Sequence, residues 1–202
     1  FAFIGVRFIR CKSSDIDIDR IAFFTINMQL FGISTSGIEH NTFRLGSFFD
    51  SRMHINIHGE VSGGYVNENL FLAGNYQNTS AFNESLSSFG VAFTTNVGAY
   101  FDHNNNLFQK PCFQLAIGVP ATTGQRTPVL LDNAGGRNKF FGSRVEGYNT
   151  AVMDVISDVN LLKGNRMDVL TLIGSDINQS FVRNNVGGLA SNNYVIFESD
   201  SG

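Results

Sequence analysis

The chain has 202 residues, of which 43% are hydrophobic and 15% are charged, and its formal net charge is -3 with no run of Lys or Arg. This composition is typical of a globular protein with one substantial core, and it excludes both a disordered chain and a protein that binds nucleic acid through a basic patch. The 20 Phe, the 21 Gly and the abundant Asn indicate a β-rich fold with many turns, because Asn and Gly tolerate positive φ angles.

The first predicted strands lie before residue 31. From Asp15 to Leu30 the even-numbered residues are mostly apolar, which predicts one long or bent strand whose even face lies in the core. Three aspartates, Asp15, Asp17 and Asp19, then share the outer face. Residues 1–10 form a further predicted strand.

The three aspartates are the one candidate for a cofactor site, because calcium prefers several carboxylate oxygens close together. The EF-hand pattern is not met, since Arg20 stands where the turn Gly belongs and Ile26 stands where the bidentate Glu belongs. On a strand, neighbouring members of Asp15, Asp17 and Asp19 lie about 7 Å apart, which is too wide for one ion without loop oxygens. The pattern therefore favours a solvated acidic face, with calcium as the alternative.

Three Phe-Phe doublets fall within predicted strands. Because successive strand side chains point to opposite faces, one ring of each doublet must leave the core of the domain. A Phe on an outer face is usually buried against another layer or another subunit. From the parity of the flanking apolar residues, the predicted interface residues are Phe23, Phe48 and Phe140, and the predicted core partners are Phe24, Phe49 and Phe141.

The next strand runs over residues 52–61 and alternates between apolar and polar residues. Its polar face includes His54 and His58, which lie about 13 Å apart on a strand, too far for one metal ion to join them. We expect both imidazoles to face solvent or an interface.

Later strands are predicted at residues 69–76, 89–101, 113–119, 127–131, 151–159, 167–173 and 193–198. Clusters of Asn and Gly separate them, and a short helix within 152–162 is an alternative for one of them. About ten short strands with frequent turns predict an all-β fold, an antiparallel β-sandwich of the jelly-roll type.

The motifs of catalysis are missing from the sequence. There is no Gly-x-Ser-x-Gly elbow, no P-loop spacing and no paired Cys ligands for a metal. Cys11 and Cys112 are more often free in a chain of this length than joined in a disulfide. No stretch is long and apolar enough for a transmembrane helix. We therefore expect a protein that is not an enzyme and does not insert into a membrane.

The second half of the chain, over roughly residues 85–200, resembles the C1q/TNF-like jelly-roll family. The resemblance lies in the run VAFTTNVGAYFD from Val91, in NLFQKPCFQL from Asn106, in the strand-turn-strand segment from Val152 to Leu172, and in a closing strand from Asn193. Asn165 stands where the family has Asp after the turn glycine, and the closing Ser/Thr-x-Phe-x-Gly motif is missing. The resemblance implies a compact trimer with aromatic strands along the threefold axis and with binding through the outer loops.

These patterns lead to one expected organisation and two expected functions. Residues 1–202 would form a single jelly-roll domain, and the alternative is an N-terminal β segment over 1–80 followed by a C1q/TNF-like domain over 81–202. The first function is that of an oligomeric, trimeric structural or binding protein in particle assembly or receptor attachment, such as a viral or phage capsid, decoration or fibre component. It would be extracellular or part of a virion, and its partners would be copies of itself, neighbouring structural proteins, or a cell-surface receptor or glycan. The second function is that of a secreted carbohydrate-binding β-sandwich module, with Asn, Asp and Tyr of the loops as contacts.

Overall fold

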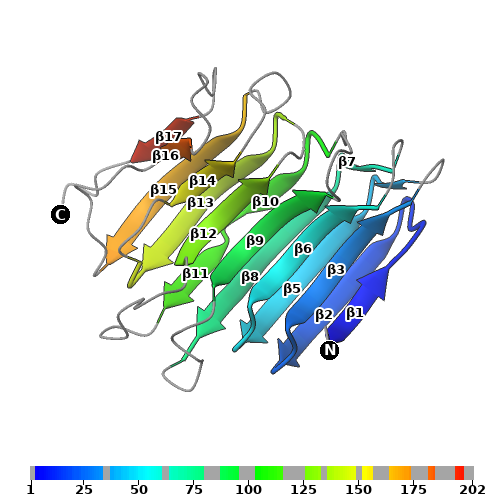
Figure 1. Cartoon of the computed structure of the whole chain (residues 1–202), viewed down its shortest axis with the longest axis horizontal. Coiled ribbons are helices and arrows are strands. Elements are labelled where there is room, and N and C mark those ends of the chain that lie inside the picture. Colours follow the sequence, from blue (N-terminus) through cyan, green and yellow to red (C-terminus); the bar gives the residue numbers. More distant parts are fainter. Residues whose placement is uncertain are drawn as a thin grey trace.

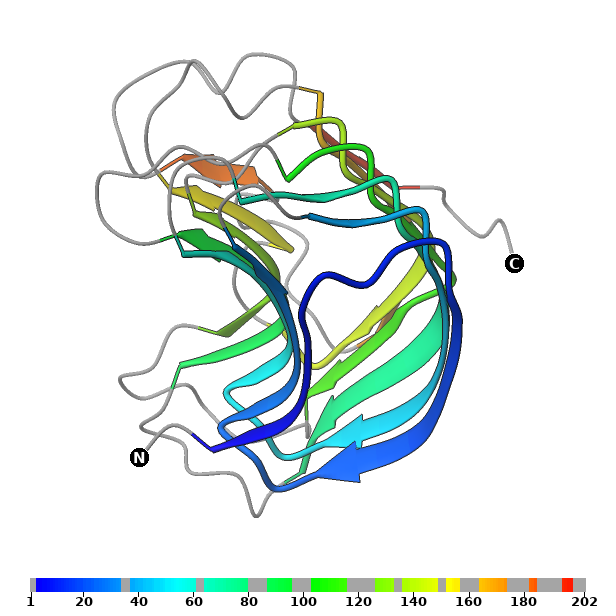
Figure 2. The same ribbon diagram turned by 90° about the vertical axis from the view of Figure 1, so that its right-hand side faces the viewer.

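The computed structural model is an all-β solenoid in which two long sheets face each other across one core (Figure 1, Figure 2). It describes residues 3–33, 37–60, 64–79, 87–95, 103–115, 126–132, 136–148, 152–156, 164–173, 182–184 and 194–197. Each coil gives one strand to one sheet and the next strand to the other sheet before the chain returns.

Sheet 1 has seven strands in the order β1-β3-β6-β9-β12-β14-β16. Their bounds are β1 Ile4–Phe8, β3 Ile26–Gly32, β6 Met53–Gly59, β9 Ser88–Thr95, β12 Arg126–Asp132, β14 Met153–Ile156 and β16 Val182–Asn184.

Sheet 2 has eight strands, in the order β17-β15-β13-β10-β8-β5-β2, with β11 beside both β13 and β8. Their bounds are β2 Asp15–Ala22, β5 Thr42–Phe49, β8 Leu70–Asn78, β10 Leu107–Gln109, β11 Cys112–Leu115, β13 Lys139–Glu146, β15 Arg166–Ile173 and β17 Tyr194–Phe197. A short third sheet joins β4 Ile38–Glu39 to β7 Val66–Asn67. Each long sheet pairs strands that come before and after residue 80 in the sequence, β6 with β9 and β8 with β10.

The predicted antiparallel jelly roll is wrong, because the strand pairs of all three sheets are parallel. The prediction of an all-β fold with many short strands is confirmed. The alternation of apolar and polar residues shows only that one face of a strand is buried. Strands with parallel and with antiparallel neighbours share this pattern, so it could not distinguish the two topologies. The segment proposed as an alternative helix begins as strand β14, and residues 157–162 lie outside the described residues.

A ladder of buried asparagines runs along the solenoid where the chain enters sheet 2. Along this ladder each Nδ2 donates to the Oδ1 of the asparagine in the next coil at 2.9 to 3.1 Å, and the same Oδ1 accepts the backbone N–H of the donor residue. Its members are Asn41, Asn69, Asn106, Asn138 and Asn165, spaced 28, 37, 32 and 27 residues apart. Ser14 takes the equivalent position in the first coil and donates its backbone N–H to Asn41 Oδ1 at 3.0 Å. A buried amide is costly unless it is hydrogen-bonded, so the stack ties each coil to the next.

Aromatic rings form a second ladder two residues beyond the asparagines. Phe43, Phe71, Phe108 and Phe140 stack nearly parallel, with centroid distances of 5.0, 4.2 and 4.5 Å. A further row joins Phe48 to Tyr76 at 5.6 Å and Tyr76 to Phe113 at 5.3 Å. Leu30, Ile57, Phe93 and Leu131 come into the same core from sheet 1. The core is therefore filled by like side chains stacked coil on coil.

Cys11 and Cys112 are both free, as the sequence favours. Among the described residues there is no helix long and apolar enough to span a membrane.

Candidate functional site

The three predicted interface rings occupy two different environments. Phe23 lies at the corner between β2 and β3 and is 75% exposed, as predicted. The outward placement of Phe48 and Phe140 is wrong, because both are fully buried members of the stacked rows. Phe24 was predicted to be a core residue and is instead 37% exposed.

The outward placement of Phe48 and Phe140 is wrong because the strands that carry them, β5 and β13 of sheet 2, are irregular. In β5 the buried positions shift from Phe43 and Leu45 to Phe48, with Gly46 between them. In β13 the register shifts between Phe140 and Ser143, across Gly142 with its φ of 66°. One extra residue of this kind moves every later side chain to the opposite face.

The predicted acidic face is present on β2. Asp15, Asp17 and Asp19 are exposed and alternate with the partly buried Ile16 and Ile18. Arg44 of the next coil lies 3.8 Å from Asp15 and 3.5 Å from Asp17. The part of the chain that the structure describes holds no group of three acidic, His or Cys side chains that could bind a metal ion. Calcium at this face stays a prediction.

His54 was expected to face solvent or an interface and is instead completely buried. Its Nδ1 lies 3.2 Å from Asn27 Nδ2, and burial lowers the pKa of His54 to about 3. His103 is also buried, accepts the backbone N–H of Val66, and has its pKa lowered to about 3, mainly by burial. Both imidazoles are therefore neutral parts of the interior near neutral pH.

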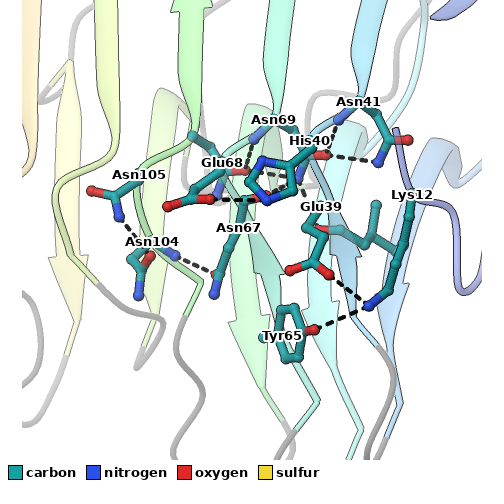
Figure 3. Close-up of polar contacts among 12 residues, drawn as sticks. Lys12, Glu39, His40, Asn41, Tyr65, Asn67, Glu68, Asn69, Asn104 and Asn105 are labelled. Carbon is teal, nitrogen blue, oxygen red and sulfur yellow. Dashed lines mark hydrogen bonds and ion pairs between the residues drawn. The ribbon is translucent and has the colours of Figure 1, made fainter. Parts of the chain in front are cut away.

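Exposed polar side chains gather at the turns before the asparagine ladder (Figure 3). The residue before each ladder asparagine has a positive φ, from 55° to 67°, in His40, Glu68, Asn105, Arg137 and Gly164. Ser13, before Ser14, has a φ of 49°. We call the surface formed by Lys12, Glu39, His40, Tyr65, Asn67, Glu68, Asn104 and Asn105 the turn cluster. In Figure 3 its side chains lie beside the ladder asparagines Asn41 and Asn69.

The charges of the turn cluster are paired within it. Lys12 Nζ lies 2.5 Å from Glu39 Oε1 and 3.4 Å from the Tyr65 hydroxyl. The hydrogen bond to Glu39 raises the pKa of Lys12, and the same bond lowers the pKa of Glu39. His40 Nε2 lies 3.3 Å from Glu68 Oε2. Exposed pairs of this kind contribute little stability, so they shape the surface more than they hold the fold.

The outer face of sheet 1 carries a second polar surface, which reaches across several coils. Gln29 Nε2 donates to Asn56 Oδ1 at 2.8 Å, and Asn56 Nδ2 donates to Thr94 Oγ1 at 2.8 Å. His58 Nδ1 lies 2.8 Å from the same Thr94 oxygen. These residues alternate along their strands with the core residues Leu30, Ile57 and Phe93, so they point away from the core.

A stack of planar groups extends this surface toward β1. The Arg7 guanidinium lies 4.8 Å from the centre of the Phe31 ring, and that ring stacks on His58 at 5.5 Å with an interplanar angle of 14°. Arg7 is exposed, whereas Phe31 and His58 are partly buried. We call Arg7, Gln29, Phe31, Asn56, His58 and Thr94 the outer polar row.

The outer polar row provides donors and acceptors of hydrogen bonds. Gln29 and Asn56 are buried, so the groups that can pair with hydroxyl or anionic groups of a ligand are the exposed Arg7 guanidinium and the partly buried His58 and Thr94. The row is suited to binding.

Sequence reasoning missed the outer polar row because it considered each strand alone. His54 and His58 were compared only with each other, whereas the partners of His58 in the row come from neighbouring strands. The missing signal was the repeat Asn-x-Phe, at residues 41–43, 69–71, 106–108 and 138–140. A recurring motif at this period indicates stacked coils, and stacked coils place residues of successive strands side by side.

Comparisons of the chain with models of protein families, with curated proteins and with solved structures find no match.

Proposed function

We propose that the chain is a structural and binding protein without enzymatic activity, and that the outer polar row attaches it to a glycan receptor. The observation that carries the proposal is the hydrogen-bonded line from Gln29 through Asn56 to Thr94 and His58, with the exposed Arg7 beside it. Sugars present several hydroxyl groups that both donate and accept, and the hydroxyl of Thr94, the imidazole of His58 and the guanidinium of Arg7 match this demand.

The solenoid supports such a role through its rigidity. Neighbouring strands lie about 4.8 Å apart, so side chains from successive coils form a regular row on the surface. Gln29 and Asn56 are almost fully buried, which holds the exposed members of the row in place. A fixed row of this kind binds without a large ordering cost. A protein of this type acts outside the cell, at a cell surface or on a particle.

The test is the retention of the purified chain on a panel of immobilised neutral and acidic glycans. We expect Arg7→Ala and His58→Ala to weaken binding to the preferred glycan by about tenfold, as for the loss of one charged or buried hydrogen bond. Glu68→Ala, an exposed change in the turn cluster, serves as the matched control and is expected to bind normally. Equal loss in the control, or release of sugar products during incubation, contradicts the proposal.

A second candidate function, assembly with copies of itself, is favoured by one exposed apolar corner. Phe23 is 75% exposed, and Phe3 and Phe24 are 63% and 37% exposed. The backbone oxygen of Phe3 accepts the N–H of Ile26, and the Phe24 ring lies against Gly5, so the three rings belong to neighbouring coils at one corner. Exposed aromatic groups of this kind often mark contacts between proteins.

A further inference from the structure

The outer face of sheet 2 has a hollow of about 430 Å³ across β2, β5 and β8. Its outward apolar side chains are Leu72 and Ala73, and its rim includes Asp17, Asp19 and Arg44. The volume lies in the range of small-ligand sites in proteins, about 300–1,000 Å³. The hollow is on the other sheet from the outer polar row, so it is a separate surface.

Two residues without large side chains line the hollow, Gly46 and Ala73. A Cβ at Gly46 would lie 2.0 Å from the backbone oxygen of Asp19, so only glycine fits there. Ala73, the register partner of Leu45 in the next coil, has a φ of 61° and is exposed. The surface is therefore lower at Gly46 and Ala73 than at the surrounding polar side chains.

The rim carries more negative than positive charge. Asp15 and Asp17 share the single guanidinium of Arg44, and Asp19 makes no ion pair with any described residue. The nearby Arg20 is directed to the Phe49 ring, with its guanidinium carbon 5.1 Å from the ring centre. An organic cation is thus favoured at the Asp17–Asp19 side of the rim.

The apolar surface of the hollow decides between an organic cation and a metal ion. Calcium requires six to eight oxygen ligands, and the side chains of Leu72 and Ala73 supply none of them. A lysine side chain has a methylene stem that can lie on apolar surface while its ammonium stays at a polar rim. We propose that the hollow binds a lysine side chain of a partner protein, with the stem on Leu72 and Ala73 and the ammonium at Asp17 and Asp19.

The experiment uses the full chain and a fluorescent Ala-Lys-Ala peptide, with the ε-acetylated peptide as the matched ligand. Binding is followed by fluorescence anisotropy. We expect Asp19→Asn and Leu72→Asn each to weaken binding by about tenfold, the effect of losing one charge-assisted contact or one buried stem. Asp15→Asn, on the same strand and outside the lining of the hollow, is expected to bind within about twofold of the unchanged chain. The acetylated peptide is expected not to bind.

Three results would overturn the proposal. The first is equal weakening by Asp15→Asn and Asp19→Asn, which would mean that only the overall charge of the face matters. The second is equal binding of the acetylated peptide. The third is displacement of the lysine peptide by millimolar calcium chloride but not by an equal ionic strength of sodium chloride, which would assign the site to the metal ion. A change of circular dichroism in any variant excludes that variant, and Leu72→Gln then replaces Leu72→Asn.

Discussion

The inside and the outside of sheet 2 follow opposite rules. Inside, one residue type recurs from coil to coil, as in the asparagine ladder and in the stacked rings of Phe43, Phe71, Phe108 and Phe140. Outside, register partners differ freely, as in the row Asp15, Thr42, Leu70, Leu107, Lys139 and Arg166. Interior side chains must match the group above and below them, whereas outer side chains need only tolerate water. The outer rows can therefore carry the differences on which recognition depends.

The largest expected effect is that of Phe108→Ala, at the centre of the ring ladder. Phe108 stacks on Phe71 at 4.2 Å and on Phe140 at 4.5 Å, and it is fully buried. Its truncation should lower the free energy of unfolding by about 3–5 kcal/mol through lost burial and a cavity. Chemical denaturation measures this change. Leu170→Ala, at an exposed position of β15, is the control and should change stability by less than about 0.5 kcal/mol.

Asn106→Ala should have the next largest effect, because Asn106 is bonded on both sides. The change removes the acceptor of the Asn69 backbone N–H and one of the acceptors of its Nδ2, and it removes the side-chain donor to Asn138 Oδ1 and to the Val66 carbonyl. A cost of about 2–4 kcal/mol is expected for buried groups left unpaired. The neighbouring Asn105→Ala is an exposed control with a positive φ, and it should cost less. Equal thermal stability of the two variants would mean that the ladder does not stabilise the fold.

The ladders also show what sequence reasoning could find. The alternation of Asp15, Asp17 and Asp19 with Ile16 and Ile18 predicts the two faces of β2 correctly, because one side of the strand faces solvent and the other faces the core. The single strand predicted from Asp15 to Leu30 is wrong, because β2 ends at Ala22 and β3 belongs to the other sheet. The same reasoning fails across Gly46 and Gly142, because the irregularity there means that residues on its two sides do not share one alternation, and the faces of Phe48 and Phe140 are then assigned wrongly.

The parallel topology was harder to predict than the strands. Its signal is the recurrence of Asn-x-Phe, but the ladder spacing varies between 27 and 37 residues because the coils differ in the length of their connections. A search for a fixed period therefore misses it, and the composition of a solenoid resembles that of a sandwich. The outer polar row depends on contacts between strands of different coils, so it could not be predicted until the register was known.

Acid should destabilise the interior through its two buried histidines, His54 and His103. Burial lowers the pKa of both His54 and His103 from 6.5 to about 3 in the folded state. Proton uptake thus favours the unfolded chain, so stability is full above pH 6.5 and falls as the pH drops from 6.5 toward 3. Each imidazole should contribute about 1.4 kcal/mol per pH unit to this loss. Denaturation at pH 7, 6 and 5 measures the slope, and His54→Asn should reduce it by about half. A flat profile over this range would show that the two histidines do not remain neutral inside.

The smallest expected effect on stability is that of Phe23→Ser, an outer position at the corner between β2 and β3. Phe23 has a φ of 66° and a largely exposed ring, so its replacement should change the free energy of unfolding by less than about 0.5 kcal/mol. If copies of the chain associate through this corner, the same change should shift the native mass measured by light scattering toward that of the monomer. Phe48→Ser is the matched interior change and should unfold the chain, because its ring lies in the core. If Phe23→Ser alters stability as much as Phe48→Ser, the corner belongs to the core and the contrast between inner and outer rows fails there.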